Sequence, residues 1–166
     1  MTKFVYLFYL SLYVLSACSN ATSKNSDYES KIETLVLSEN NQGVEYIFSV
    51  DDENNVLEYS ITYLGKFKTS KNKVLYAEIL NGNKISPRLN TYLVIYDEQN
   101  NRLGKYGSVT PKPEVDGDNL LFKEKYGDCN QPTTIDFKMN IPEQIFINCQ
   151  EENGQMFGSS YSFSKE

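Results

Sequence analysis

The chain contains no histidine and no tryptophan, and it has only three cysteines among its 166 residues. Without histidine it can form neither a Ser-His-Asp nor a Cys-His catalytic group, and it has no imidazole metal ligand and no histidine pH switch. Basic residues are also outnumbered, with 16 Lys and Arg against 22 Asp and Glu and a net charge of −6. Because nucleic acids are bound by neutralising their phosphates, we do not expect nucleic acid as a partner.

The first 17 residues differ in composition from the rest of the chain. Lys3 is their only charged residue, and an apolar stretch from Phe4 to Leu15 precedes Ser16, Ala17 and Cys18. A single positive charge, a short apolar segment and small residues before a cleavage point are typical of a secretory signal peptide. A membrane-spanning helix needs about 20 apolar residues, and the chain becomes polar directly after Cys18. We therefore predict that residues 1–17 are a signal peptide that is removed.

The sequence Leu15-Ser16-Ala17-Cys18 resembles the lipobox of bacterial lipoproteins, Leu-(Ala/Ser)-(Gly/Ala)-Cys. The resemblance implies that Cys18 becomes the first residue of the mature protein and carries diacylglycerol, commonly with a further N-acyl chain such as palmitate. Two or three acyl chains hold a protein at a membrane nearly permanently, whereas one chain holds it weakly. In Gram-negative lipoproteins a residue other than Asp after the cysteine usually permits transfer to the outer membrane, and Ser19 fits that pattern. The resemblance therefore implies the bacterial cell envelope, with the outer membrane favoured over the inner one.

The two other cysteines are Cys129 and Cys149. An exported protein folds in an oxidising compartment, which favours a disulfide between them, and such a bond would stabilise the fold by about 3 kcal/mol. A metal pair or a redox pair is a poorer interpretation, because there is no histidine and the spacing is not C-x-x-C. We predict a structural disulfide, with two free thiols as the alternative.

Three segments follow from this organisation: the signal peptide at 1–17, a lipidated cysteine with a flexible polar tether at 18–30, and a single domain at 31–166. Loss of Lys3 with the signal peptide changes the net charge from −6 to −7. Anionic lipid repels such an acidic domain, so the acyl chains rather than charge would hold the protein at the membrane.

The dominant hydrophobic period after residue 31 is two, which is typical of strands. Residues 44–50 and 57–63 alternate apolar and polar side chains around the turn-forming stretch 51–55, which predicts a β-hairpin. The remaining predicted strands are 74–80, 91–97 (a central strand, apolar on both faces), 103–109, 120–123, 134–139, 144–149 and 156–163. Asn81-Gly82-Asn83 is predicted to end one strand and residues 110–118 to form a loop. No helix is expected, so the sequence predicts an all-β fold, an antiparallel β-sandwich or a barrel-like domain.

Two charged clusters are candidate sites. Asp116 and Asp118 resemble the start of a calcium-binding loop, but Leu120 stands where a third oxygen ligand belongs. We favour the interpretation that these acids form a turn, and we predict no metal site. Four lysines, Lys66, Lys68, Lys71 and Lys73, could form a docking patch for an acidic partner or an anionic polysaccharide. We favour the alternative that they protect an edge hairpin from pairing with other strands.

No catalytic residue emerges from the sequence. Glycosidases use a pair of carboxylates, but a chain with 22 acidic residues offers many such pairs, so their presence does not indicate a glycosidase. No Gly-x-Ser-x-Gly motif is present. We therefore expect no enzyme activity and no cofactor, and we expect a lipid-anchored envelope protein that binds a protein partner. One alternative is an inhibitor or immunity-type lipoprotein that blocks a toxin, hydrolase or phage receptor, since acidic surfaces attract basic proteins. Another is a His-independent carboxylate hydrolase.

Overall fold

The computed structural model describes residues 28–51, 54–123, 132–150 and 156–166. The chain divides into two compact units, Met1–Leu35 and Val36–Glu166. The second unit contains all the described strands, and the first contributes only the start of a helix to the described residues.

A helix covers residues 28–39, where none was predicted. Its apolar residues Tyr28, Ile32, Leu35 and Val36 repeat at helical spacing. It ends at Asn40, whose φ of 52° is the left-handed conformation common after a helix, and whose N–H donates to the carbonyl of Val36. The prediction of no helix was wrong, and the predicted tether 18–30 overlaps the helix at residues 28–30. No described helix has the length and apolar character that crossing a membrane requires.

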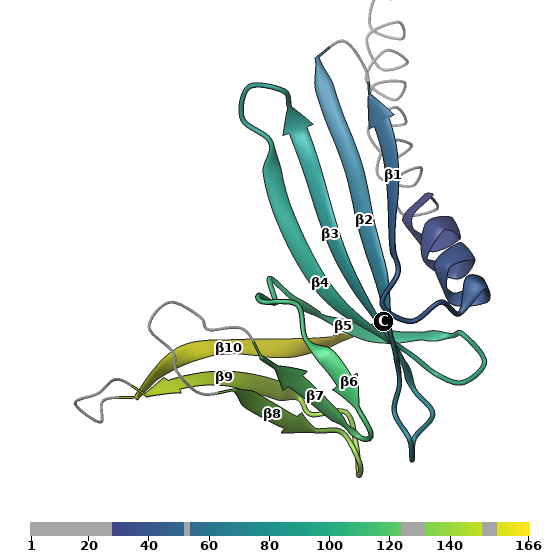
Figure 1. Ribbon diagram of the computed structural model, residues 1–166. Helices are drawn as coiled ribbons and strands as arrows, with labels where there is room; N and C mark the ends of the chain where they lie inside the picture. Colours follow the sequence, from purple (N-terminus) through teal and green to yellow (C-terminus); the bar gives the residue numbers. More distant parts are fainter. Residues whose placement is uncertain (1–27, 52–53, 124–131, 151–155) are drawn as a thin grey trace, which may run out of the picture. The chain divides into compact units, whose positions relative to one another are not determined.

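Seven antiparallel strands form the larger sheet, in the order β1-β2-β3-β4-β5-β10-β9 (Figure 1). They are β1 (Glu45–Asp51), β2 (Asn55–Lys66), β3 (Lys73–Asn83), β4 (Arg88–Tyr96), β5 (Arg102–Gly107), β9 (Gln144–Gln150) and β10 (Met156–Lys165). A second sheet of three antiparallel strands has the order β6-β7-β8, with β6 (Glu114–Asp116), β7 (Asn119–Phe122) and β8 (Thr133–Asp136). The predicted all-β fold is confirmed, in the form of the two-sheet sandwich.

The predicted first hairpin is confirmed. Tyr46 lies opposite Ile61 and Phe48 opposite Tyr59, so the alternating apolar residues of the two strands share one face. The predicted central strand is also confirmed, because β4 lies between β3 and β5.

Two predicted irregular segments are strands instead. The strand β3 continues through Asn81-Gly82-Asn83, where Asn81 pairs with Arg88 and Gly82 with Val56, so the turn falls at residues 84–87. Within the predicted loop 110–118, Glu114–Asp116 forms β6, the first strand of the smaller sheet. In each case pairing with neighbouring strands overrides the local preference of Asn, Gly and Pro for turns.

The core of the second unit lies between the two sheets. Phe67 and Phe137 stack there with ring centroids 4.6 Å apart, and Tyr106 meets Phe137 edge-on at 6.4 Å. The buried cluster consists of Leu64, Phe67, Val74, Tyr76, Leu93, Ile95, Tyr106, Val109, Leu120, Phe122, Phe137, Ile145, Ile147 and Tyr161. It takes residues from β2, β3, β4, β5, β7, β9 and β10, which makes the two sheets one packed unit.

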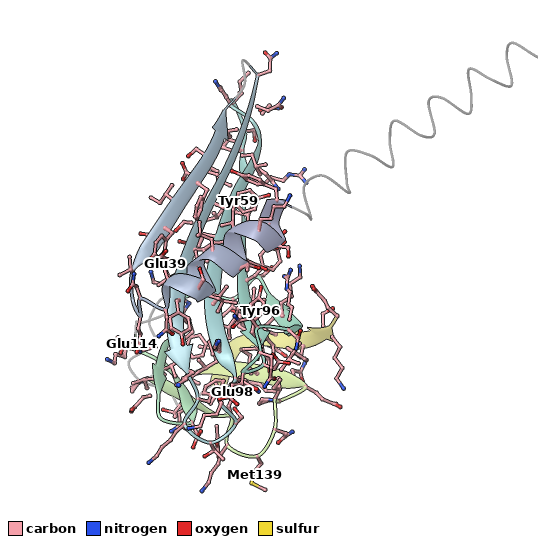
Figure 2. The ribbon with its side chains drawn as sticks, turned by 90° about the vertical axis from the view of Figure 1, so that its right-hand side faces the viewer. Glu39, Tyr59, Tyr96, Glu98, Glu114 and Met139 are labelled. Carbon is pink, nitrogen blue, oxygen red and sulfur yellow. The ribbon has the colours of Figure 1, made fainter. Side chains whose placement is uncertain are left out.

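The opposite face of the long strands is also apolar. Ile61, Ala77 and Val94 alternate with the core residues along β2, β3 and β4, and each is buried. In Figure 2, Tyr59 marks the upper part of these long strands, and Met139, which is 87% exposed, marks the other end of the same unit.

Candidate functional site

The four lysines of the predicted docking patch lie at the end of the β2–β3 hairpin. Lys66, the last residue of β2, pairs with Lys73, the first residue of β3, and Lys68 and Lys71 lie in the connecting loop. Lys66, Lys68 and Lys71 are exposed, whereas Lys73 donates from Nζ to Asn100 Oδ1. Both strands are internal to the sheet. The interpretation as an edge hairpin was therefore wrong, because these lysines cap the end of two paired strands.

The loop that carries these lysines is anchored to the smaller sheet. The buried Phe67 donates from its N–H to Asn72 O at 2.9 Å, and Lys68 N–H donates to Gly117 O at 3.0 Å. Thr69 donates twice to Asp118, from its backbone N to Oδ1 and from its Oγ1 to Oδ2, both at 2.7 Å. The loop thus has a fixed conformation and presents its lysines from a defined position.

Asp118, one of the two calcium candidates, has both carboxylate oxygens engaged by Thr69. These hydrogen bonds, with the positive charges of Lys138 and Lys68, hold the pKa of its carboxyl below the usual value. Asp116 ends β6 and is exposed. In the parts of the chain that the structure describes, no three His, Cys, Asp or Glu residues gather in a way that could hold a metal ion. The structure gives Asp118 a role as a hydrogen-bond acceptor in a turn, which is the interpretation that the sequence favoured over calcium binding.

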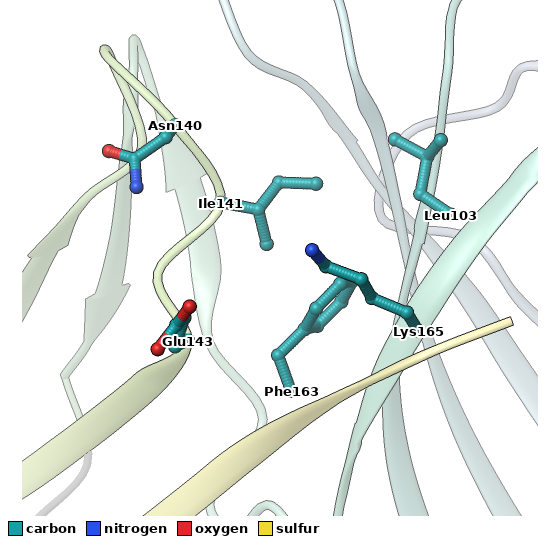
Figure 3. A pocket seen from close by; sticks show the side chains of 6 residues that line it. All are labelled: Leu103, Asn140, Ile141, Glu143, Phe163 and Lys165. Carbon is teal, nitrogen blue, oxygen red and sulfur yellow. The ribbon is translucent and has the colours of Figure 1, made fainter.

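A pocket of about 680 Å³ lies beside the C-terminal strand (Figure 3). Leu103 of β5 and Phe163 and Lys165 of β10 line one side, and residues of the segment that leads into β9 line the other. These lining residues of the leading segment are Asn140, Ile141 and Glu143.

Two hydrogen bonds fix the segment that forms this second side. The hydroxyl of Tyr106 donates to Pro142 O at 2.5 Å, and Phe163 N–H donates to Glu143 O at 2.8 Å. Tyr106 is fully buried, which raises the pKa of its hydroxyl well above 10.0, and its ring packs against that of Phe163 at 5.0 Å. Since Tyr106 sits in the core and Phe163 lines the pocket, the walls are continuous with the core of the sandwich.

The pocket has both apolar and charged lining residues. Leu103, Ile141 and Phe163 supply the apolar surface, and the amino group of Lys165 extends over it (Figure 3). Among the described residues that line it, Glu143 is the one carboxylate. The arrangement suits contact with an apolar group that has polar or charged groups beside it.

Sequence analysis did not predict this pocket. Its residues come from positions 103, 140–143 and 163–165, and only the pairing of β5 with β10 and the packing of the leading segment bring them together. Ile141 falls between Asn140 and Pro142 and has no strand neighbour, which is a weak signal of an apolar residue used at a surface.

The cysteine predictions fall outside what the structure describes. Cys18 and Cys129 lie outside the described residues, and for Cys149 only its backbone position in β9, opposite Phe157, is described. Lipidation of Cys18 and the bond between Cys129 and Cys149 therefore stay predictions.

No known protein family, curated protein sequence or solved structure matches this chain.

Proposed function

We propose that this chain is a lipid-anchored protein of the bacterial cell envelope that acts by binding a partner and not by catalysis. The observation that carries the anchor is the sequence Leu15-Ser16-Ala17-Cys18 after a short apolar segment. Acyl chains on Cys18 would hold the protein at the membrane against the repulsion between its acidic domain and anionic lipid.

The pocket beside β10 supports a binding role. It combines apolar side chains with the charged Lys165 and Glu143, and its walls are fixed by hydrogen bonds to Pro142 and Glu143. A preformed apolar surface with a few oriented charges is the usual composition of a recognition site. A chain without histidine, and a pocket with a single carboxylate, also favour binding over hydrolysis.

The anchor is tested by metabolic labelling with a palmitate analogue in a bacterial host that processes lipoproteins. We expect the wild-type chain to be labelled and Cys18→Ala to lose the label completely. Ser19→Ala, which keeps the lipobox, is the matched control and should be labelled like the wild type. Label that persists in Cys18→Ala would contradict the anchor.

The binding role is tested by photo-cross-linking in the envelope. A photoreactive side chain at Asn140, an exposed pocket residue, should yield cross-links to a defined protein, and a second substitution, Lys165→Glu, should reduce them. The matched control is Ile85, which is 97% exposed in the β3–β4 turn. Equal cross-linking from the two positions would argue against the pocket as the binding site.

The identity of the cross-linked protein separates the two binding alternatives. Resident envelope proteins would support an interaction module. A single basic protein of foreign origin would support the inhibitor or immunity-type alternative, because the acidic chain attracts basic proteins.

A further inference from the structure

The strand β1 is an outer strand of the larger sheet. In the part of the chain that the structure describes, β1 has a strand neighbour on one side only, β2. Alternate residues of an outer strand direct their backbone N–H and C=O groups away from the sheet, and these groups pair readily with another strand. At the other margin of the sheet, β9 lies against β8 of the smaller sheet.

Proteins usually block such edges with lysine, proline, a bulge or a very short strand. The strand β1 has none of these devices: it spans seven residues, Glu45–Asp51, it contains no lysine or proline, and its register with β2 is unbroken. Its five inner residues, Tyr46-Ile47-Phe48-Ser49-Val50, are uncharged. This edge is therefore both chemically and geometrically able to accept a further strand.

Ile47 supplies a second observation at the same edge. Its side chain is 62% exposed, and its neighbours on that face of β1 are Glu45 and Ser49. Val44, directly before the strand, is 46% exposed. An apolar side chain of this size in the middle of an outer strand is expected to gain burial when the edge is occupied.

We propose that β1 pairs antiparallel with β1 of a second copy of this chain, with Ile47 opposite Ile47 of that copy. This register places Tyr46 opposite Phe48, an aromatic pair, and Glu45 opposite Ser49, so that no two like charges meet. Centring the pair on Phe48 instead would set Glu45 opposite Asp51, two acidic residues, which is unfavourable. The strand can thus pair with its own copy in a register centred on Ile47, as a two-fold symmetric interface requires.

Cysteine cross-linking of the full chain, purified in detergent, tests the pairing. Residues directly opposite in an antiparallel pair have Cα atoms about 4.5–5.5 Å apart, which is within the range of a disulfide. Under mild oxidation Ile47→Cys should give a covalent dimer. The matched control Ile85→Cys, in an even more exposed apolar position, should give no more dimer than the wild type, which sets the background from the native cysteines.

The register has its own test, which uses two exposed positions of the same face. A mixture of Glu45→Cys and Ser49→Cys chains should cross-link more than either chain alone, because the proposed register places these positions opposite each other. Ile47→Lys should convert the protein to a monomer by light scattering, whereas Ile85→Lys should leave it a dimer.

The proposal is overturned if Ile47→Cys cross-links no more than Ile85→Cys, or if the mixed chains cross-link no more than the separate ones. If β1 instead pairs with a strand from a different protein, Ile47→Cys would cross-link no more than Ile85→Cys. The experiment does not depend on lipidation of Cys18, so failure of the proposed anchor would leave its outcome readable.

Discussion

The carboxylate of Asp118 accepts two hydrogen bonds from Thr69, each 2.7 Å long, and thereby joins the β2–β3 loop to the β6–β7 turn. The backbone carbonyl of Asp118 also accepts a hydrogen bond from Phe137 N–H at 2.8 Å. A single turn residue therefore links the larger sheet, its own sheet and the segment that carries the stacked Phe137.

Replacing Asp118 with Ala should lower the melting temperature by about 2–4 °C, the scale expected when a hydrogen-bonded link is lost in a domain of this size. Asp116→Ala, at the exposed end of the adjacent strand β6, is the control and should have little effect. Thermal unfolding followed by circular dichroism at pH 7 measures both. Equal effects of the two substitutions would show that the link to Thr69 does not stabilise the fold.

The same link predicts a dependence on pH. Because the pKa of Asp118 is below its usual value of 3.8 in the folded state, its contribution to stability is present above that value and is lost as the pH falls through the folded pKa. The wild type should therefore lose more stability between pH 5 and pH 2.5 than Asp118→Asn does. Parallel losses of melting temperature in the two proteins over this range would contradict the assignment.

Replacing Phe67 with Ala should be strongly destabilising. Phe67 is fully buried and stacks on Phe137 at 4.6 Å, so truncation leaves a cavity between the sheets and is expected to cost about 3–5 kcal/mol. Urea unfolding measures the difference, with the exposed Met139→Ala as the control that should stay within about 0.5 kcal/mol. A loss below about 1 kcal/mol for Phe67→Ala would mean that the two sheets do not depend on this contact.

Replacing Tyr106 with Phe should leave Pro142 O without its buried donor and cost about 1–2 kcal/mol. Burial raises the pKa of Tyr106 in the folded state, so its effect on stability is constant below the unfolded value of 10.0 and is lost as the pH rises above it. The variant should therefore lose less stability than the wild type above pH 10. Tyr46→Phe, which removes a hydroxyl bonded to the exposed Asn41, is the control; a similar alkaline profile in all three proteins would refute the role of Tyr106.

Replacing Gly104 with Ala should disrupt the pairing of β5 with β10. Gly104 has a φ of 151°, and an added Cβ would lie 2.3 Å from Ser164 O and 2.6 Å from the ring of Phe163. Gly107→Ala in the same strand meets nothing closer than 3.9 Å and is the control. Hydrogen exchange should show faster exchange in β10 for Gly104→Ala alone, and unchanged protection there would contradict the prediction.

The period-two pattern predicted most of the strands because each long strand buries alternate residues on a defined face, as Tyr59 and Ile61 do in β2. The helix at 28–39 escaped prediction because its apolar residues are few and stand among polar ones. The strand β6 escaped because Pro113 and Gly117 flank it and only its pairing with β7 makes it a strand. The local preference of a segment for strand or turn does not include the effect of pairing with a strand from elsewhere in the chain.

The candidate sites were harder to predict than the fold. The four lysines could be identified in the sequence. Their position at the end of internal strands depends on the strand order, which the hydrophobic pattern of the sequence does not determine. The pocket depends on Leu103, Ile141 and Phe163 meeting through the β5–β10 pairing. Exposure of Ile47 likewise depends on β1 being the outer strand, a property of topology and not of its own sequence.

The strand order also affects the order in which the strands can pair during folding. Strands β1 to β4 each pair with the next strand along the chain, so their hairpins close short loops, whereas β5 receives its second neighbour from β10, the last strand. Closing a longer loop costs more entropy and slows the pairing that requires it. A chain that is synthesised from its N-terminus can therefore assemble strands β1 to β5 early, whereas the second edge of β5 stays unpaired until β10 is available. Until β10 pairs with it, the second edge of β5 is exposed in addition to the outer edge of β1. A folding chaperone or another unfolded chain could bind there.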